Sequence, residues 1–296
     1  MTTDDRPRTR RLLSPDRRPP TADRRNAPAR PVLKWVGGKG QLLRELLARL
    51  PQSFKTYHEP FTGGGALFFE LAAQGRITTA YLSDANPSLI DVYLGLRDCV
   101  DEVIAVLRQH RYEHDYYYYV RALRPTDLSL PERAARIIYL NKTCYNGLYR
   151  ENRRGEFNVP FGRYKNPTIC DEPNLRAASA VLQGVNIARR PFDSTLDYAK
   201  RGDFVYFDPP YHPVSATANF TSYDRDGFGP DNQRRLRDAA TELRERGVTA
   251  MVSNSDTPFI RELYAGFHID QVQASRAVNS KANGRGKVAE LIIRNY

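Results

Sequence analysis

Residues 203–211 read Asp-Phe-Val-Tyr-Phe-Asp-Pro-Pro-Tyr. The first half of this stretch is a run of aromatic and β-branched residues without polar alternation, which is typical of a strand buried on both faces of a parallel sheet. Pro209 and Pro210 end the strand, because proline cannot donate a hydrogen bond to a neighbouring strand and holds its backbone extended. The sequence therefore predicts a rigid turn at the carboxyl end of a central strand, where open α/β sheets bind ligands.

The groups in this turn suit a flat ring that carries an amino group. Asp208 and the backbone carbonyls beside it, including that of Pro209, can accept N–H bonds, and Tyr211 offers a face for stacking. The same four residues are equally compatible with a proline-stiffened surface loop. The assignment therefore depends on the rest of the chain.

Composition indicates a basic globular protein. The 296 residues carry a net charge of +11 with a pI near 9.6, which favours a polyanionic partner. No apolar run approaches the roughly 18 residues of a membrane helix, and no signal-peptide core is present near the start. Three cysteines without Cys-x-x-Cys spacing fit a reduced, cytoplasmic protein, and the five scattered histidines predict no metal site.

Residues 1–31 differ from the rest of the chain. They hold nine arginines and four aspartates, a difference of +5, with almost nothing to bury. Such a composition cannot offset the entropy of ordering the chain, so we expect a disordered arm. The arm is equally consistent with a contact to DNA phosphates and with a solvated extension.

Two glycine-rich stretches precede predicted helices. Residues 33–40 read LKWVGGKG, and residues 57–66 read YHEPFTGGGA. Glycines let the backbone approach a polar or anionic ligand at a helix N-terminus, and Lys39 adds positive charge there. Asp84 ends the next predicted strand about 20 residues beyond the second stretch, where a carboxylate can accept bonds from ribose hydroxyls. The spacing predicts a nucleoside-containing cofactor, whereas the third glycine of the dinucleotide fingerprint is missing.

Residues 141–167, NKTCYNGLYRENRRGEFNVPFGRYKNP, hold six basic and two acidic side chains. Asn146-Gly147 and Arg154-Gly155 are turn signals, and residues 156–159 read as a short strand. A basic hairpin with interleaved aromatic and amide side chains is suited to reading base edges in a DNA groove. A solvated charged loop is the alternative interpretation.

The remaining pattern alternates helices and strands. The four tyrosines at residues 116–119 lie in a helical region and are interpreted mainly as helix packing. Residues 215–229 predict a mobile flap beside the Asp-Pro-Pro-Tyr turn. The basic segment at residues 280–287 is consistent with phosphate contacts or with a simple turn between the last two strands.

In this order, the motifs resemble the adenine-N6 DNA methyltransferases of the Dam family. The resemblance covers about residues 32–296. Its pieces are LKWVGGK (33–39), EPFTGGG (59–65), LSDAN (82–86), the whole segment 141–167, DPPY (208–211), SATANF (215–220) and SNSDT (253–257). One departure is Thr143-Cys144, which stands where the family has Arg-Tyr-Gly type residues.

The resemblance implies an α/β fold with a Rossmann-like, seven-stranded, mostly parallel sheet and an inserted helical target-recognition domain that bears a β-hairpin. It implies a catalytic domain at residues 32–90 and 184–296 and a recognition domain at 91–183. It also implies S-adenosylmethionine as methyl donor, double-stranded DNA as substrate and GATC as target.

The resemblance also assigns site residues. Target adenine would be received by Asp208, Pro209 and Tyr211. Cofactor would be held by Trp35, Lys39, Phe61, Gly63, Gly65, Asp84, Phe192, Asp193 and Asp208. DNA would be contacted by Lys34, Tyr145, Asn146, Leu148, Arg150, Pro160, Tyr164 and Lys165.

Three alternatives stay open at this point. Cytosine-N4 methylation uses similar geometry, but those enzymes more often carry serine in place of Asp208. RNA methylation would fit the charge, and a DNA-binding protein without activity would fit the scaffold. We expect a monomer, which suffices for methylating one strand of a palindrome per visit, and the sequence leaves a partner restriction endonuclease undecided.

Overall fold

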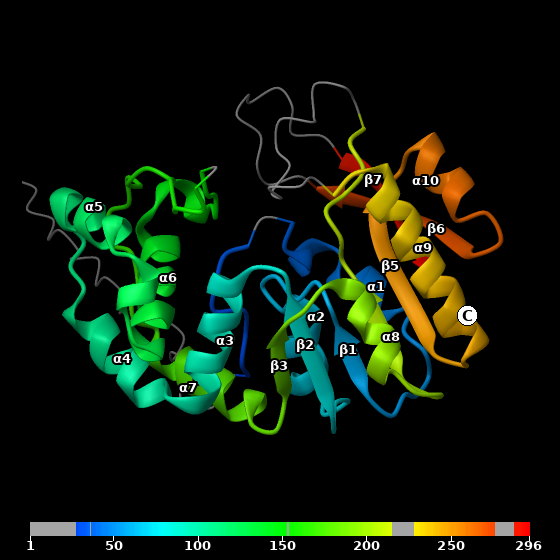
Figure 1. The fold of residues 1–296 in the computed structure, drawn as a ribbon, viewed down its shortest axis with the longest axis horizontal. Helices are drawn as coiled ribbons and strands as arrows, with labels where there is room; N and C mark the ends of the chain where they lie inside the picture. Colours follow the sequence, from blue (N-terminus) through cyan, green and yellow to red (C-terminus); the bar gives the residue numbers. More distant parts are fainter. Residues whose placement is uncertain (1–27, 36, 153, 215–227, 276–286) are drawn as a thin grey trace, which may run out of the picture.

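The computed structural model describes residues 28–35, 37–152, 154–214, 228–275 and 287–296 (Figure 1). Most of the predicted arm at 1–31, nearly all of the predicted flap at 215–229 and the basic segment at 280–287 therefore lie outside the described residues, apart from a few flanking positions. In the part of the chain that is described, none of the helices is long and apolar enough to cross a membrane.

A seven-stranded sheet forms the centre of the molecule, in the order β3-β2-β1-β4-β5-β7-β6. Strands β1 to β5 run parallel to one another, and β7 runs antiparallel between β5 and β6. The predicted seven-stranded, mostly parallel sheet is thus confirmed. The strands are β1 Tyr57–Glu59, β2 Ala80–Asp84, β3 Asn186–Arg189, β4 Phe204–Phe207, β5 Thr249–Ser255, β6 His268–Ser275 and β7 Lys287–Arg294.

Strand β4 is buried on both faces, as its uninterrupted apolar sequence predicts. Phe204 and Tyr206 belong to an apolar cluster that includes residues of β1, β2 and the helices beside them. Val205 and Phe207 point the other way, into a second cluster with residues of α9 (Pro230–Glu245) and α10 (Pro258–Leu263). Successive side chains of a strand face opposite sides, so β4 holds the two layers together.

The other helices cover the sheet or form a group beside its β3 edge (Figure 1). The group beside the edge, drawn in green, consists of α4, α5, α6 and α7. The helices are α1 Leu43–Leu47, α2 Ala66–Ala73, α3 Pro87–Asp98, α4 Val100–Gln109, α5 His114–Ala122, α6 Leu130–Thr143, α7 Glu172–Leu182 and α8 Thr195–Tyr198, with short 3-10 turns at Lys39–Gln41, Pro125–Asp127, Tyr145–Gly147 and Phe192–Ser194.

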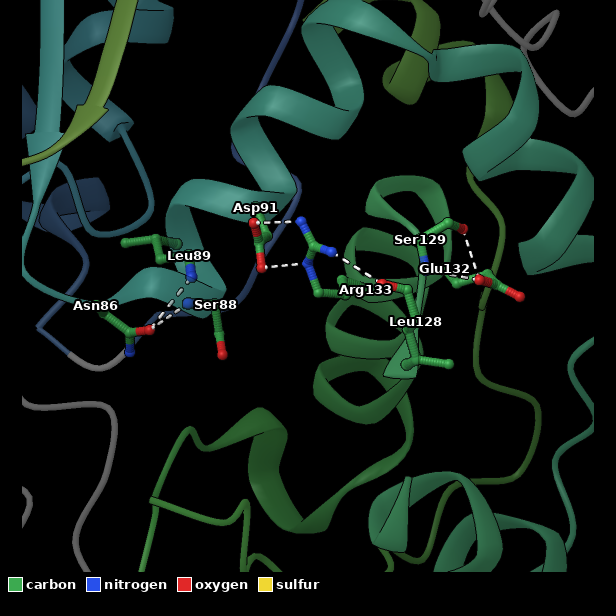
Figure 2. Close-up of polar contacts among 8 residues, drawn as sticks. All are labelled: Asn86, Ser88, Leu89, Asp91, Leu128, Ser129, Glu132 and Arg133. Carbon is green, nitrogen blue, oxygen red and sulfur yellow. Dashed lines mark hydrogen bonds and ion pairs between the residues drawn. The ribbon is translucent and has the colours of Figure 1, made fainter. Parts of the chain in front are cut away.

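Helix α3 joins the sheet to the helical group through α6 (Figure 2). The Arg133 guanidinium of α6 binds both carboxylate oxygens of Asp91 in α3, at 2.8 and 3.2 Å. Asn86 caps α3 by accepting from two backbone N–H groups, and Ser129 with Glu132 forms a capping box on α6. Both helices therefore begin at fixed points beside the ion pair.

Close backbone packing reinforces this join. A Cβ atom at Gly95 of α3 would lie 2.6 Å from the Ala134 Cβ of α6, so only glycine fits. Helix α3 contacts β2 and β3 as well as α4, α6 and α7. The predicted domain boundary at residues 90–91 falls inside this shared helix and stays a prediction.

Candidate active site

The parallel strands β1 to β4 bring their carboxyl ends to one edge of the sheet. The chain runs outward from β1 to β2 and β3 on one side and to β4 and β5 on the other. Crevices at such a switch point are where open α/β sheets bind ligands. Glu59, Asp84 and the Asp208 turn all lie at this edge.

Glycines in the loop after β1 let other side chains pack closely against its backbone. Gly63 and Gly65 have φ values of +49° and +66°, a region that side-chain-bearing residues avoid. A Cβ at Gly63 would lie 2.9 Å from the Trp35 ring, and one at Gly65 would lie 2.8 Å from the Tyr93 hydroxyl. Trp35 thus packs directly on the glycine loop.

Asp84 lies at the end of β2 against the same loop. Its carboxylate accepts from the backbone N–H groups of Gly63, at 3.1 Å, and Asn86, at 3.0 Å. These bonds fix the orientation of the Asp84 carboxylate against the glycine loop. The structure therefore brings Trp35, Gly63, Gly65 and Asp84 together, as the sequence predicts.

Aromatic rings line the neighbouring part of this edge. Phe61 and Phe192 stack with centroids 5.4 Å apart, and Phe228 meets both edge-on. Asp193, the residue after Phe192, forms an ion pair with Arg235 of α9. Phe61 and Phe192 are therefore adjacent, whereas the Asp193 carboxylate is engaged with a helix on the outer side.

Asp208 and Lys39 form the polar centre of the site. The Lys39 ammonium lies 2.6 Å from Asp208 Oδ1, donates to the Gly37 carbonyl at 2.8 Å and sits 4.6 Å from the centroid of the Tyr211 ring. Lys39 is 7% exposed, so little water screens the pair. The site thus joins the first glycine stretch to the Asp-Pro-Pro-Tyr turn.

Burial sets the protonation of two acids here. Desolvation raises the pKa of Asp208 to about 6, while the nearby Lys39 charge opposes the shift. Desolvation also raises the pKa of Glu59 to about 8, against the hydrogen bond from the Tyr57 hydroxyl. At neutral pH Asp208 is therefore mostly ionised and Glu59 mostly neutral.

Three residues that the sequence analysis did not single out position the turn. The Tyr211 hydroxyl donates to Glu290 of β7 at 2.9 Å. Gln233 of α9 donates to the Pro210 carbonyl at 3.0 Å and accepts from Asn254 of β5 at 3.0 Å. Asn254 lies in the SNSDT motif and Glu290 is an acid in an apolar strand, which are usable signals, whereas Gln233 has none in the sequence.

The segment at 141–167 lies beside the helical group and reverses direction as predicted. Asn146 and Gly147 have φ values of +56° and +64°, which form the predicted turn, and backbone bonds link Asn152 with Glu156 and Asn158 with Arg150. The predicted strand at 156–159 is wrong, because the described residues form only isolated bridges, Glu151 with Phe157 and Cys144 with Phe161. The Val159 carbonyl accepts from Tyr117 and Arg121 side chains of α5 instead of a partner strand.

Most of the residues predicted to contact DNA are exposed, and several of them also pack on or bond to the protein itself. Lys34, Tyr145, Asn146, Arg150, Pro160 and Lys165 are exposed. Leu148 is half-buried, and the partly exposed Tyr164 turns its hydroxyl back to the Cys144 carbonyl at 2.9 Å. The Asn158 side chain holds Arg150, accepting from Nε at 2.6 Å.

Comparison with known proteins agrees with this geometry. Residues 35–278 match the family model described as D12 class N6 adenine-specific DNA methyltransferase. The chain is 43% identical to the type II methyltransferase M1.LlaDCHI of Lactococcus lactis subsp. cremoris, covering 90% of this chain and 95% of the relative. It is 42% identical to the type II methyltransferase M.MjaIII of Methanocaldococcus jannaschii, covering 90% and 99%.

A third relative bears the name that the motifs suggested. The chain is 35% identical to the DNA adenine methylase of Haemophilus influenzae, over 89% of this chain and 92% of that protein. The match spans both the carboxyl edge of the sheet and the segment at 141–167. This chain therefore belongs to the D12 class of N6 adenine-specific DNA methyltransferases, which use S-adenosylmethionine as methyl donor.

Proposed function

We propose that the protein methylates N6 of an adenine that is flipped out of double-stranded DNA, within the sequence GATC. The observation that carries this proposal is the Asp208 carboxylate, held by Lys39 at the carboxyl end of the central strand with the Tyr211 ring beside it. The family supplies the reaction, and the site supplies groups that match an adenine amino group.

The residues at this edge fit S-adenosylmethionine. The tight glycine loop after β1 packs on Trp35, Asp84 is oriented beside it by the Gly63 and Asn86 N–H groups and would bind ribose hydroxyls, and Phe61 with Phe192 offers aromatic surface for an adenine ring. The residues proposed to hold it are Trp35, Lys39, Phe61, Gly63, Gly65, Asp84, Phe192, Asp193 and Asp208. The cofactor supplies a methyl group on a positively charged sulfur.

The protein's part in the chemistry is to prepare the amino nitrogen. The lone pair of an adenine amino group is conjugated into the ring, which makes the nitrogen a poor nucleophile. The Asp208 carboxylate and the Pro209 carbonyl accept its two N–H bonds, which favours a tetrahedral nitrogen with its lone pair directed away from the ring. Catalysis then depends on positioning and electrostatics, without a covalent enzyme intermediate.

The target base has to leave the duplex, because its amino group is inaccessible in stacked DNA. Tyr211 is proposed to stack on the extruded adenine, and the bond from its hydroxyl to Glu290, which restricts the orientation of the ring, supports this role. The bond from Gln233 to Pro210 likewise fixes the turn, so the receiving groups are preorganised.

The exposed residues of segment 141–167 and Lys34 are proposed to read the target. Arg150 Nε donates to the Asn158 side-chain oxygen at 2.6 Å and Nη2 donates to the Asn158 carbonyl at 3.3 Å. These bonds hold the guanidinium in one orientation, from which its remaining N–H groups would reach a guanine edge. Tyr145, Asn146, Leu148, Pro160, Tyr164 and Lys165 would complete the contacts to bases and phosphates.

The wider setting is proposed from the family names. Two relatives are called type II methyltransferases, which favours a role beside a restriction endonuclease, and we propose a monomer that acts on DNA in the cytoplasm. The predicted division into a catalytic domain (32–90 and 184–296) and a recognition domain (91–183) belongs to this proposal.

Plasmid protection tests the proposal. Unmethylated plasmid is incubated with the protein and S-adenosylmethionine, then cut with GATC enzymes that differ in sensitivity to adenine methylation. We expect protection from the sensitive enzyme only. Methyl transfer without protection would contradict the GATC assignment while preserving the chemistry.

A further inference from the structure

Asn141 near the end of α6 joins two segments that are far apart in the sequence. Its side-chain oxygen accepts from the Lys34 N–H at 2.8 Å, and its Nδ2 donates to the Lys34 carbonyl at 2.8 Å and to the Gly147 carbonyl at 3.0 Å. Asn141 is 2% exposed, so these bonds face little competition from water. Both amide hydrogens and the oxygen are therefore in use.

The two joined segments form one continuous surface. A Cβ at Gly147 would lie 2.7 Å from Lys34 Cδ, so the lysine chain rests on the backbone of the Tyr145–Gly147 turn. The Lys34, Tyr145 and Asn146 side chains are all exposed, and Tyr145 and Asn146 directly precede the glycine on which the Lys34 chain rests. Asn141 sets the position of Lys34 relative to the Tyr145–Gly147 turn, because its side chain forms hydrogen bonds to the backbone of both segments.

The same backbone continues into the cofactor loop. Trp35 follows Lys34 and packs on Gly63, and its ring lies 5.1 Å from that of Tyr149. A shift of residue 34 would therefore be resisted on the cofactor side by Trp35, while the turn at 145–147 would lose its bond from Asn141 and keep the Tyr145 N–H bond to the Pro160 carbonyl. Loss of Asn141 should disturb target reading more than cofactor binding.

We propose that Asn141 is a positioning residue for sequence recognition, which holds Lys34 and the Tyr145–Leu148 turn in the register that reads the target. This inference rests on the proposed function, because it takes these residues as DNA contacts. Asn141 itself does not touch DNA. It acts through Lys34 and Gly147.

The chain contains a matched control. Asn174 of α7 holds Arg30 in the same way, accepting from its N–H at 3.0 Å and donating to its carbonyl at 3.1 Å. Asn174 is also buried, but it makes no bond to segment 141–167 among the described residues. Asn141→Asp and Asn174→Asp therefore both remove the bond to the carbonyl of the residue that the side chain clasps, Lys34 or Arg30, and only the first also removes a bond to Gly147.

The experiment measures kcat/KM on the duplex that the wild type methylates and on duplexes with one base pair changed. For Asn141→Asp we expect the preference to fall about tenfold or more, because one good base contact discriminates by roughly that factor. The Kd of Asn141→Asp for S-adenosylmethionine should stay within about twofold of the wild-type value. The sequence preference of Asn174→Asp should also stay within about twofold of wild type. An unchanged preference in Asn141→Asp, or equal losses in both variants, would overturn the proposal.

Two further variants separate positioning from general damage. In a Lys34→Ala background, Asn141→Asp should lower the preference by a smaller factor than in wild type, because the residue acts through Lys34. Should Asn141→Asp not fold, Gly147→Ala provides the test, since its methyl group displaces the Lys34 chain, and an unchanged preference there would also overturn the proposal. A wild type that prefers a sequence other than GATC would contradict the proposed target alone, because every ratio is taken on the duplex that is methylated.

Discussion

Asp208 is balanced between burial, which favours its neutral form, and the Lys39 ammonium at 2.6 Å, which favours its ionised form. The result is a carboxylate that is ionised at neutral pH yet poorly hydrated. Such a group is a strong acceptor for the N–H bonds of an amino group.

Replacing Asp208 by asparagine tests the role of its negative charge, because the two side chains have nearly the same size and shape. The amide presents a donor as well as an acceptor and carries no charge, so we expect kcat to fall by at least about a hundredfold. DNA binding, measured by fluorescence anisotropy, should stay within a few-fold of wild type. Turnover near the wild-type value would remove Asp208 from the chemistry.

The pH dependence of kcat/KM reports the same group in the free enzyme. Because the raised pKa of Asp208 is about 6, the ionised form is lost as pH falls through that value, and kcat/KM should decline below pH 6. Lys39 lowers this pKa, so Lys39→Met should move the acidic limb to higher pH. A limb that does not move would contradict the assignment.

Arg150 is the residue whose loss should change sequence preference most simply. Arg150→Ala removes a guanidinium already oriented by Asn158, and we expect a cost of about 1–3 kcal/mol on the cognate duplex with relaxed preference at one base pair. Arg124→Ala removes an exposed arginine paired with Asp127 outside the segment and should change neither quantity. Equal effects of both variants would indicate a general loss of charge.

At the scale of elements, α3 and α6 connect the sheet to the helical group that carries segment 141–167. The contact between the two helices depends on Gly95, because the absence of a side chain there lets the α3 backbone pack directly on Ala134 of α6. It also depends on the ion pair between Asp91 and Arg133. This ion pair is half-buried, and the cost of desolvating its charges offsets much of their attraction, so the close packing at Gly95 is the stronger constraint.

Gly95→Leu therefore has a predictable cost. Leucine has a higher helix propensity than glycine by up to about 1 kcal/mol, but forcing α3 from α6 costs about 1–3 kcal/mol and outweighs it. Urea unfolding should show a lower midpoint, while Gly40→Ala, where a Cβ meets nothing within 4 Å, should leave it near the wild-type value. A higher midpoint for Gly95→Leu would show that the helices adjust freely.

Elements with strong local patterns could be predicted from the sequence. Strand β4 is apolar throughout and is followed by two prolines, and Asp84 ends β2 at the expected distance from the glycines. The strand at 156–159 could not be judged, because side chains of α5 take the hydrogen bonds that a partner strand would supply. The backbone conformation of that segment is therefore determined by contacts with α5, which its own sequence does not reveal.

At the scale of the whole molecule, the site depends on contacts that no local pattern encodes. Lys39 and Asp208 are far apart in the sequence and meet because the fold brings the turn at Lys39–Gln41 to the carboxyl end of β4. Gln233, Asn254 and Glu290 come from three further elements and converge on the turn. The sequence motifs predicted which residues form the site, whereas the residues that hold them in place could be identified only from the folded structure.

The proposed function combines a chemical site at the carboxyl edge of the sheet with the basic segment 141–167, which we propose reads the target. The central claim is that these two parts act together on an adenine within GATC. The most direct test is nucleoside analysis by mass spectrometry of short duplexes after incubation with the protein and S-adenosylmethionine. We predict N6-methyladenine in the GATC duplex, and none when one base pair of the site is changed or when Asp208→Asn replaces the wild type. N4-methylcytosine, or N6-methyladenine formed equally in all duplexes, would contradict the account.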